Sequence, residues 1–147
     1  MKHFQSTIEK LEQAFVTFMR HLGPKLSEDA ESGLTGAQFY ILHLLSQKEK
    51  FRVTEIANKM CVKTSAVTVM VERLHKNDWV ARSRDEKDRR VVWIGLTDSG
   101  KEVLANAQKR RFKILAEYLQ HLDPNELDHL LHIYEKLGQI AQKMDEA

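Results

Sequence analysis

Helical hydrophobic spacing runs through most of this chain and is interrupted once, between residues 79 and 96. There two β-prone runs, Trp79–Arg84 and Val91–Leu96, flank a charged loop and predict a hairpin. The length of 147 residues suits one domain, and no apolar run approaches the ~20 residues of a membrane span. The first residues also lack the pattern of a secretory signal. We therefore expect a mainly α-helical, cytoplasmic protein with a small β-hairpin.

Two short helices are expected immediately before the hairpin. They cover Val53–Met60, with Thr54 as N-cap, and Thr64–Lys76, with Thr64 as cap. Cys61–Lys63 separates them. The second helix has an inward stripe at i, i+3, i+4 and i+7, made of Val67, Met70, Val71 and Leu74. Two short helices joined by a tight turn are typical of a helix-turn-helix.

Longer helices flank this region. The first has an apolar seam with alternating spacings of four and three: Phe4, Ile8, Leu11, Phe15, Phe18 and Leu22. Gly23–Pro24 is expected to bend or end it. Thr35–Gln38 and Asp123–Glu126 predict two further helix starts, and Thr97 is the expected cap of a fifth helix. The predicted order is α-α-α-α-β-β-α-α, with a winged helix-turn-helix lobe at 50–97 and dimerisation helices at 1–32 and 101–147.

The charge distribution favours a polyanionic partner for the middle of the chain. Between Lys48 and Trp93 there are 12 basic and 7 acidic residues, whereas the remainder is net acidic. The outward face of the second short helix offers Ser65, Thr68, Val69, Glu72, Arg73 and Lys76. Small polar side chains suit base edges in the major groove, and Val69 suits a thymine methyl. Arg73 and Lys76 lie farther along, where phosphates are the more natural partners.

The hairpin loop carries a second candidate contact with DNA. Asp88 lies two residues before Arg90, so its carboxylate can aim the guanidinium. An aimed arginine suits a narrow minor groove, where the negative potential is deepest. The other basic residues of the loop are expected at phosphates: Arg82, Arg84, Lys87 and Arg89.

In these features the sequence resembles the MarR (multiple antibiotic resistance regulator) family of transcription factors. Asp88–Thr97, followed by Gly100, is similar to the family's D-x-R, strand, L-T and glycine motif. Val53–Ala57 and Thr64–Thr68 resemble its paired helices, and Val71–Leu74 resembles the end of its second helix. The resemblance covers nearly the whole chain, which is then a single MarR-type domain over residues 1–147.

The resemblance implies a homodimer with interlocking terminal helices, a DNA operator that is pseudo-palindromic, and repression relieved by a small aromatic or phenolic ligand, an oxidant or a metal. It also implies that Asp88 orients Arg90 into the minor groove. The expected DNA-binding residues are Lys63, Thr64, Ser65, Ala66, Thr68, Val69, Arg73, Lys76, Arg84, Lys87, Asp88, Arg89 and Arg90.

The inducer is less constrained. His21, Phe39, Tyr40 and His43 could line a ligand pocket, although a place in the core is the favoured interpretation of Phe39 and its neighbours. The single cysteine, Cys61, lies in the turn between the paired helices and is either a small structural residue or a thiol activated by nearby lysines. The histidines do not converge as three or four metal ligands, so no metal and no cofactor is expected.

Two other function classes remain for comparison. No phosphate-binding loop, nucleophile elbow or paired catalytic carboxylates suggest an enzyme. A winged-helix module that binds proteins and not DNA is the stronger alternative. A steep salt dependence of DNA affinity would separate the two, because DNA binding releases condensed counterions.

Overall fold

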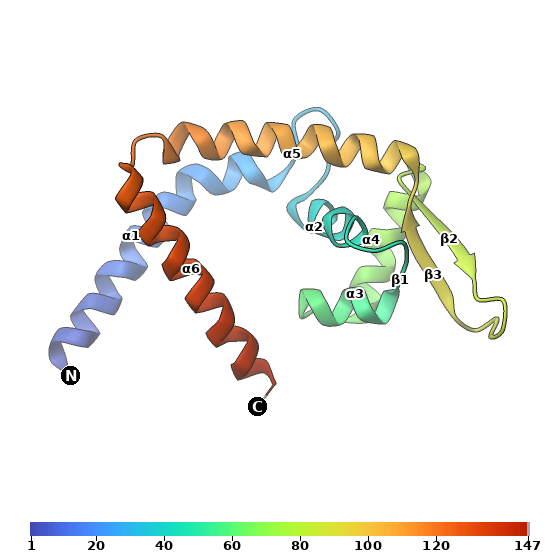
Figure 1. The fold of residues 1–147 in the computed structure, drawn as a ribbon, viewed down its shortest axis with the longest axis horizontal. Coiled ribbons are helices and arrows are strands. Elements are labelled where there is room, and N and C mark those ends of the chain that lie inside the picture. The colour runs from blue at the N-terminus through green and yellow to red at the C-terminus, as the bar shows by residue number, and fades with distance from the viewer. Residues whose placement is uncertain (147) are drawn as a thin grey trace. The chain divides into compact units, whose positions relative to one another are not determined.

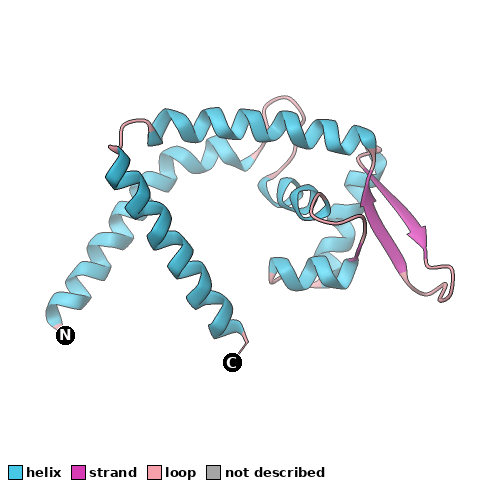
Figure 2. Cartoon of the chain, viewed as in Figure 1, coloured by secondary structure: helices cyan, strands magenta, loops and turns pink. Residues whose placement is uncertain are grey.

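The computed structural model describes residues 1–146, and it has the mainly helical fold with a small sheet that the sequence predicts (Figures 1 and 2). The chain forms two compact units, Met1–Arg110 and a second that starts at Arg111, which are described separately. In chain order the elements are α1 (Lys2–Ser27), α2 (Gly36–Leu45), β1 (Phe51–Arg52), α3 (Val53–Met60), α4 (Thr64–Lys76), β2 (Val80–Arg84), β3 (Val92–Leu96), α5 (Asp98–Leu119) and α6 (Pro124–Asp145).

The first unit contains the hydrophobic core. Helices α2, α3 and α4, the three strands and the first half of α5 all contribute to it. Leu42, Ile56, Val67, Leu74 and Ile94 are completely buried. The stripe predicted for α4 is confirmed, since Val67, Val71 and Leu74 are buried and Met70 is half-buried. This packing leaves the opposite face of α4 to solvent.

The sheet has three antiparallel strands in the order β1-β3-β2. The hairpin β2–β3 is confirmed, with Arg82 opposite Ile94 and Ser83 opposite Trp93. β1 was not predicted, because a strand of two residues is too short to show an alternating pattern. It pairs with β3 through Phe51 opposite Ile94 and thereby attaches the start of α3 to the wing.

The base of the hairpin explains why a glycine follows the Leu96-Thr97 pair. The backbone N–H of Gly100 donates to Thr97 Oγ1 at 2.9 Å, which confirms Thr97 as the cap of α5. The Thr97 hydroxyl itself donates to the carbonyl of Asp78. A Cβ on Gly100 would lie 1.9 Å from the carbonyl oxygen of Trp79. Only glycine therefore lets the first turn of α5 pass so close to the backbone of Trp79, between α4 and β2.

Helices α3 and α4 have the predicted bounds, but their N-caps differ from the predicted ones. Thr54 is not the cap of α3, which starts at Val53, and the backbone N–H of its N-cap Arg52 donates to Glu55 at 3.1 Å. α4 starts at Thr64 itself, so Thr64 lies in the first turn, where its carbonyl accepts the Thr68 hydroxyl at 3.0 Å. The cap lies two residues earlier than predicted in α3 and one residue earlier in α4, because β1 ends directly at α3 and the turn before α4 is tight.

The first helix also runs farther than predicted. Pro24 lies inside α1, which continues to Ser27, so the Gly23–Pro24 pair does not end the helix. Proline removes only one intrahelical hydrogen bond, and here it is in the final turn. The Ser27 hydroxyl donates to the Pro24 carbonyl at 3.0 Å, and Leu22, one turn earlier, is buried.

The second unit consists of the end of α5 and α6. Asp123 begins α6 with the predicted capping box, since its carboxylate accepts the Glu126 N–H at 2.9 Å and the Glu126 carboxylate accepts the Asp123 N–H at 2.9 Å. No residue of α6 in the described part of the chain is buried. Among residues 1–146, no helix is both long and apolar enough to cross a membrane.

Candidate nucleic-acid interface

The outward face of α4 is the first part of the interface. Burial of Val67, Val71 and Leu74 orients the helix, and every residue predicted there as a DNA contact is exposed. Val69 is a large apolar side chain with 52% of its surface exposed. The exposed set on α4 and its N-cap is Lys63, Thr64, Ser65, Ala66, Thr68, Val69, Arg73 and Lys76.

Small side chains dominate the first two turns of this face, and the cations Arg73 and Lys76 come later. The small residues permit close approach of the helix to a base-pair edge. The Thr68 hydroxyl donates its proton to the Thr64 carbonyl, so the hydroxyl oxygen is left to act as an acceptor. The arrangement combines a readout surface with flanking positive charge.

The wing places Asp88 and Arg90 in direct contact. Asp88 Oδ1 accepts from the backbone N–H of Arg90 at 3.1 Å and from its Nε at 3.2 Å, and Oδ2 accepts from Nη2 at 3.4 Å. The Arg90 side chain is 92% exposed, so no packing determines its direction. These hydrogen bonds hold the pKa of Asp88 below its usual value, with the Arg90 side chain as the main cause. An ionised Asp88 thus orients an otherwise free guanidinium.

The other basic residues of the wing are less free than the sequence suggests. Arg84 Nη1 donates to the carbonyl of Arg89 at 2.9 Å and so braces the two sides of the loop. Arg82 lies 3.8 Å from Glu72 of α4. Lys87 and Arg89 are exposed. Arg84 therefore shapes the wing as well as contributing positive charge.

Asp85 and Trp93 are residues of the wing that the sequence analysis did not single out. Asp85 Oδ2 accepts the backbone N–H groups of Lys87 and Asp88 at 3.2 and 3.0 Å, and Oδ1 accepts the indole N–H of Trp93 at 3.2 Å. These bonds lower the pKa of Asp85, with the indole bond as the largest cause. An aspartate that caps a tight turn is a signal visible in sequence. Its tie to Trp93 depends on the hairpin register.

Two further cations lie over the indole ring of Trp93. Lys50 Nζ is 4.6 Å and Arg52 Cζ 5.0 Å from the ring centroid. Cations over a tryptophan face are stabilised by its quadrupole. The β1 segment therefore brings two positive charges to the sheet that carries the wing. A two-stranded hairpin without β1 would not place them there.

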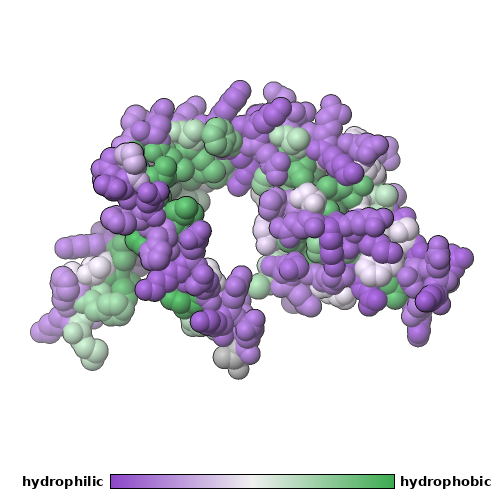
Figure 3. Space-filling model, viewed as in Figure 1, coloured by the Kyte–Doolittle hydropathy of each residue, from purple (hydrophilic) through white to green (hydrophobic). Residues whose placement is uncertain are grey.

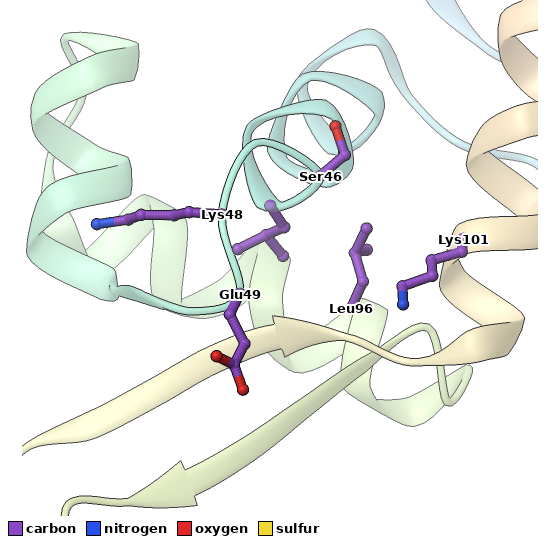
Figure 4. Close-up of a pocket in the computed structure, with 6 residues that line it drawn as sticks. Ser46, Lys48, Glu49, Leu96 and Lys101 are labelled. Carbon is purple, nitrogen blue, oxygen red and sulfur yellow. The ribbon is translucent and has the colours of Figure 1, made fainter.

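The residues predicted for a ligand pocket do not line the cavity shown in Figure 4. The Phe39 and His43 rings stack on α2, with centroids 6.5 Å apart, while His21 and Tyr40 are exposed. The cavity in Figure 4, of about 510 Å³, lies elsewhere in the first unit and is lined by Leu45, Ser46, Lys48, Glu49, Leu96 and Lys101. The ligand pocket remains a prediction.

Cys61 occupies the turn between α3 and α4 with a left-handed backbone, φ 55°. Its side chain is exposed, and Sγ lies 3.8 Å from the Asn58 carbonyl oxygen. Within residues 1–146, no three or more His, Cys, Asp or Glu residues cluster as metal ligands would. The α4 face and the wing are therefore the candidate interface.

A helix-turn-helix followed by a cationic hairpin defines the class of winged-helix DNA-binding proteins. The MarR family profile matches residues 34–92. The chain is 36% identical to the HTH-type transcriptional repressor MdtR of Bacillus subtilis (strain 168), covering 97% of this chain and 92% of that one.

Solved structures agree with this. A MepR-like protein complexed with pseudoligands is 38% identical, with a TM-score of 0.67 over 91% of this chain and 95% of that one. A MarR family protein from Bacillus stearothermophilus is 27% identical, with a TM-score of 0.77 over 97% of this chain and 98% of that one. The chain belongs to the MarR family. It is a DNA-binding transcriptional regulator and not an enzyme, and an interaction module without DNA binding is not favoured.

Proposed function

We propose that this protein is a homodimeric repressor in the cytoplasm that reads a pseudo-palindromic operator, with α4 in the major groove and Arg90 in the minor groove. The observation that carries the proposal is the Asp88–Arg90 pair, in which two hydrogen bonds from the guanidinium and one from the Arg90 backbone N–H direct a side chain that is 92% exposed. Among residues 1–146, the Arg90 side chain has no hydrogen-bond or ion-pair partner other than Asp88 to account for its direction. A narrow minor groove supplies the negative potential that it lacks.

The α4 face supports the same mode of binding. Its first turns present small polar side chains and the exposed Val69, which suit base edges and a thymine methyl. Arg73 and Lys76 lie farther along the helix and serve the phosphate backbone. The wing cations Lys87 and Arg89 contribute in the same way.

Exposed apolar residues on two helices support the homodimer. On α1 they are Phe4, Ile8, Leu11, Phe15, Val16 and Phe18, and Figure 3 shows apolar side chains gathered along this helix. On α6 they are Leu127, Leu131, Ile133, Tyr134, Leu137, Ile140 and Met144. Continuous apolar surfaces of this kind mark interfaces. A second copy of the chain covers them, and its two-fold symmetry matches half-sites about 10 base pairs apart.

Repression and its relief rest on the relatives. MdtR is named as a repressor, and the MepR-like protein was solved with pseudoligands. By extension, a small aromatic or phenolic inducer acts on this protein, and His21, Phe39, Tyr40 and His43 remain the candidate contacts. The stacked Phe39–His43 pair offers an aromatic wall for such a ligand.

The test begins with selection of duplexes from a randomised pool by the purified protein. The proposal expects a two-fold symmetric consensus, and fluorescence anisotropy should show that the selected duplex binds with a steep salt dependence. A scrambled duplex of equal length is the control. Equal binding to both duplexes, or a consensus with a single half-site, would contradict the proposed mode of recognition.

A further inference from the structure

The carboxylate of Asp85 joins the loop of the wing to strand β3. One oxygen accepts two backbone N–H groups of the loop, at Lys87 and Asp88, and the other accepts the indole N–H of Trp93 in β3. Trp93 lies on the central strand of the sheet, opposite Arg52 on one side and Ser83 on the other. Asp85 therefore fastens the loop to the most constrained part of the sheet.

This attachment reaches Arg90 through Asp88. The backbone N–H of Asp88 is held by Asp85, and the Asp88 carboxylate in turn holds both the backbone N–H and the guanidinium of Arg90. Without the Asp85 carboxylate the Asp88–Arg90 pair would persist as a local contact, and the Asp88 carbonyl would still accept the Val91 N–H at 3.0 Å. Its position relative to β3 would, however, lose the bonds that run through Asp85 to Trp93. The direction of Arg90 thus depends on a chain of hydrogen bonds that starts at Trp93.

Electrostatics alone would disfavour an acid at this position. Asp85 adds a negative charge to a loop that is otherwise suited to phosphates, and like charges repel. The neighbouring Glu86 carries the same charge but forms no hydrogen bond or ion pair among the described residues. The pair of acids therefore separates the effect of charge from the effect of position.

We propose that Asp85, held by the indole N–H of Trp93, is a positioning residue that gives Arg90 its specificity for the operator. The inference rests on the proposed function and extends it from the residue that contacts DNA to the residues that direct it. The lowered pKa of Asp85 is consistent with this role, because the carboxylate stays ionised and so keeps all its acceptor sites.

The test compares Asp85→Asn and Trp93→Phe with the matched control Glu86→Gln. Asparagine has one acceptor oxygen in place of two, so it cannot satisfy both the loop and the indole, while Trp93→Phe removes the indole N–H without changing charge. Binding is measured by anisotropy on the duplex selected by the wild-type protein and on its scrambled form. Circular dichroism checks that each variant is folded.

Asp85→Asn should weaken binding to the selected duplex about threefold to tenfold, in the lower part of the range of couplings between contacting residues. Because it also removes a negative charge, its affinity for the scrambled duplex should be unchanged or higher. Trp93→Phe should also weaken binding to the selected duplex. Glu86→Gln should not weaken either.

Two readouts separate positioning from a general loss of structure. In an Arg90→Ala background, Asp85→Asn should have no further effect on the selected duplex, since nothing is left to direct. The indole N–H resonance of Trp93, assigned by its absence in Trp93→Phe, should shift in Asp85→Asn and not in Glu86→Gln.

The inference is overturned if Asp85→Asn behaves like Glu86→Gln on both duplexes, or if it weakens the scrambled duplex as much as the selected one. A wild-type protein that selects no duplex would overturn the proposed function itself, and the inference with it. The wild-type arm therefore distinguishes the two failures.

Discussion

The winged-helix lobe and the helix α6 use similar apolar side chains in opposite ways. In the lobe, Ile56, Val67 and Ile94 are completely buried by elements of the same unit. On α6, Leu131 and Leu137 leave 59% and 55% of their surface exposed, and no described residue of the helix is buried. The α1 seam resembles α6, with Phe15 57% exposed.

The contrast shows where one chain is sufficient to bury its apolar side chains and where it is not. Several short elements around α4 shield one another, so the lobe completes its core within one protomer. A long helix cannot bury its own apolar stripe without other elements packed against it. Each Å² of apolar surface that stays exposed forgoes about 25 cal/mol of stabilisation. The lobe is therefore built to present its polar outer face, and the terminal helices to be covered.

The largest expected effect is in the lobe. Leu74→Ala should lower the free energy of unfolding by about 2–5 kcal/mol, because the side chain is completely buried. Leu131→Ala on α6 makes the same chemical change at an exposed site. Urea unfolding at two protein concentrations checks the contrast, since the loss at Leu131 should depend on concentration. Equal, concentration-independent losses would remove the distinction between the two regions.

A charge on the α6 stripe should act on assembly. Leu131→Glu should weaken the dimer by at least about 2 kcal/mol, roughly thirtyfold, because an unpaired charge would be buried between copies. Gln139→Glu, on the opposite face of the helix, is the control. Sedimentation velocity measures the mass, and a wild-type protein that stays at 17.1 kDa at micromolar concentration would show that the stripe is not a homodimer surface.

The first unit also contains a polar clamp that should respond to pH. Arg110 donates to both oxygens of Asp29 at 2.6 and 2.7 Å, and this contact holds the pKa of Asp29 well below its ordinary 3.8. Asp29→Asn should cost about 1.5–3 kcal/mol at pH 7, as expected for hydrogen bonds to a charged group. The clamp's stabilisation is complete above the unfolded pKa and falls as pH drops toward the folded one.

The cost of Asp29→Asn should therefore shrink progressively below pH 3.8. Urea unfolding at pH 7 and at pH 3 measures it, with Glu12→Gln on α1 as the control. A cost that stays constant between the two pH values would exclude the ionised clamp as its source.

Changes at the wing should leave both the core and the dimer intact. Arg90→Ala should weaken the free energy of binding to the selected duplex by about 1–3 kcal/mol, the range for one specific contact. Asp88→Ala should weaken it less, because the charge of Arg90 remains while its direction is lost, and the two changes should be non-additive. Anisotropy measures affinity, and circular dichroism checks folding. Unchanged affinity in a folded Arg90→Ala dimer would rule out the minor-groove role.

The smallest effect is expected for a phosphate contact. Arg73→Ala should lower affinity for selected and scrambled duplexes alike and reduce the salt slope by about one unit. Lys136→Ala removes the same charge from α6 and should change neither. A loss confined to the selected duplex would instead assign Arg73 to base readout.

The elements and contacts that the sequence predicts correctly depend on residues close to one another in the chain. The i, i+3, i+4 stripe of α4, the capping boxes at Thr35 and Asp123, and the Asp88–Arg90 pair all join residues within one or two turns. Such contacts form wherever the local backbone places the side chains, so their spacing predicts them. The tight turn and the hairpin follow from the same short-range rules.

Only the tertiary structure decided the contacts between distant segments. β1 exists because Phe51 and Arg52 pair with β3. The Trp93 indole N–H donates to Asp85 of the loop, and two cations of the β1 segment lie over the indole ring. The Asp29–Arg110 clamp joins α5 to the loop after α1. Burial of an apolar stripe likewise depends on what lies against it. Periodicity reports that a helix has an apolar face, but the path of the whole chain decides whether that face is covered.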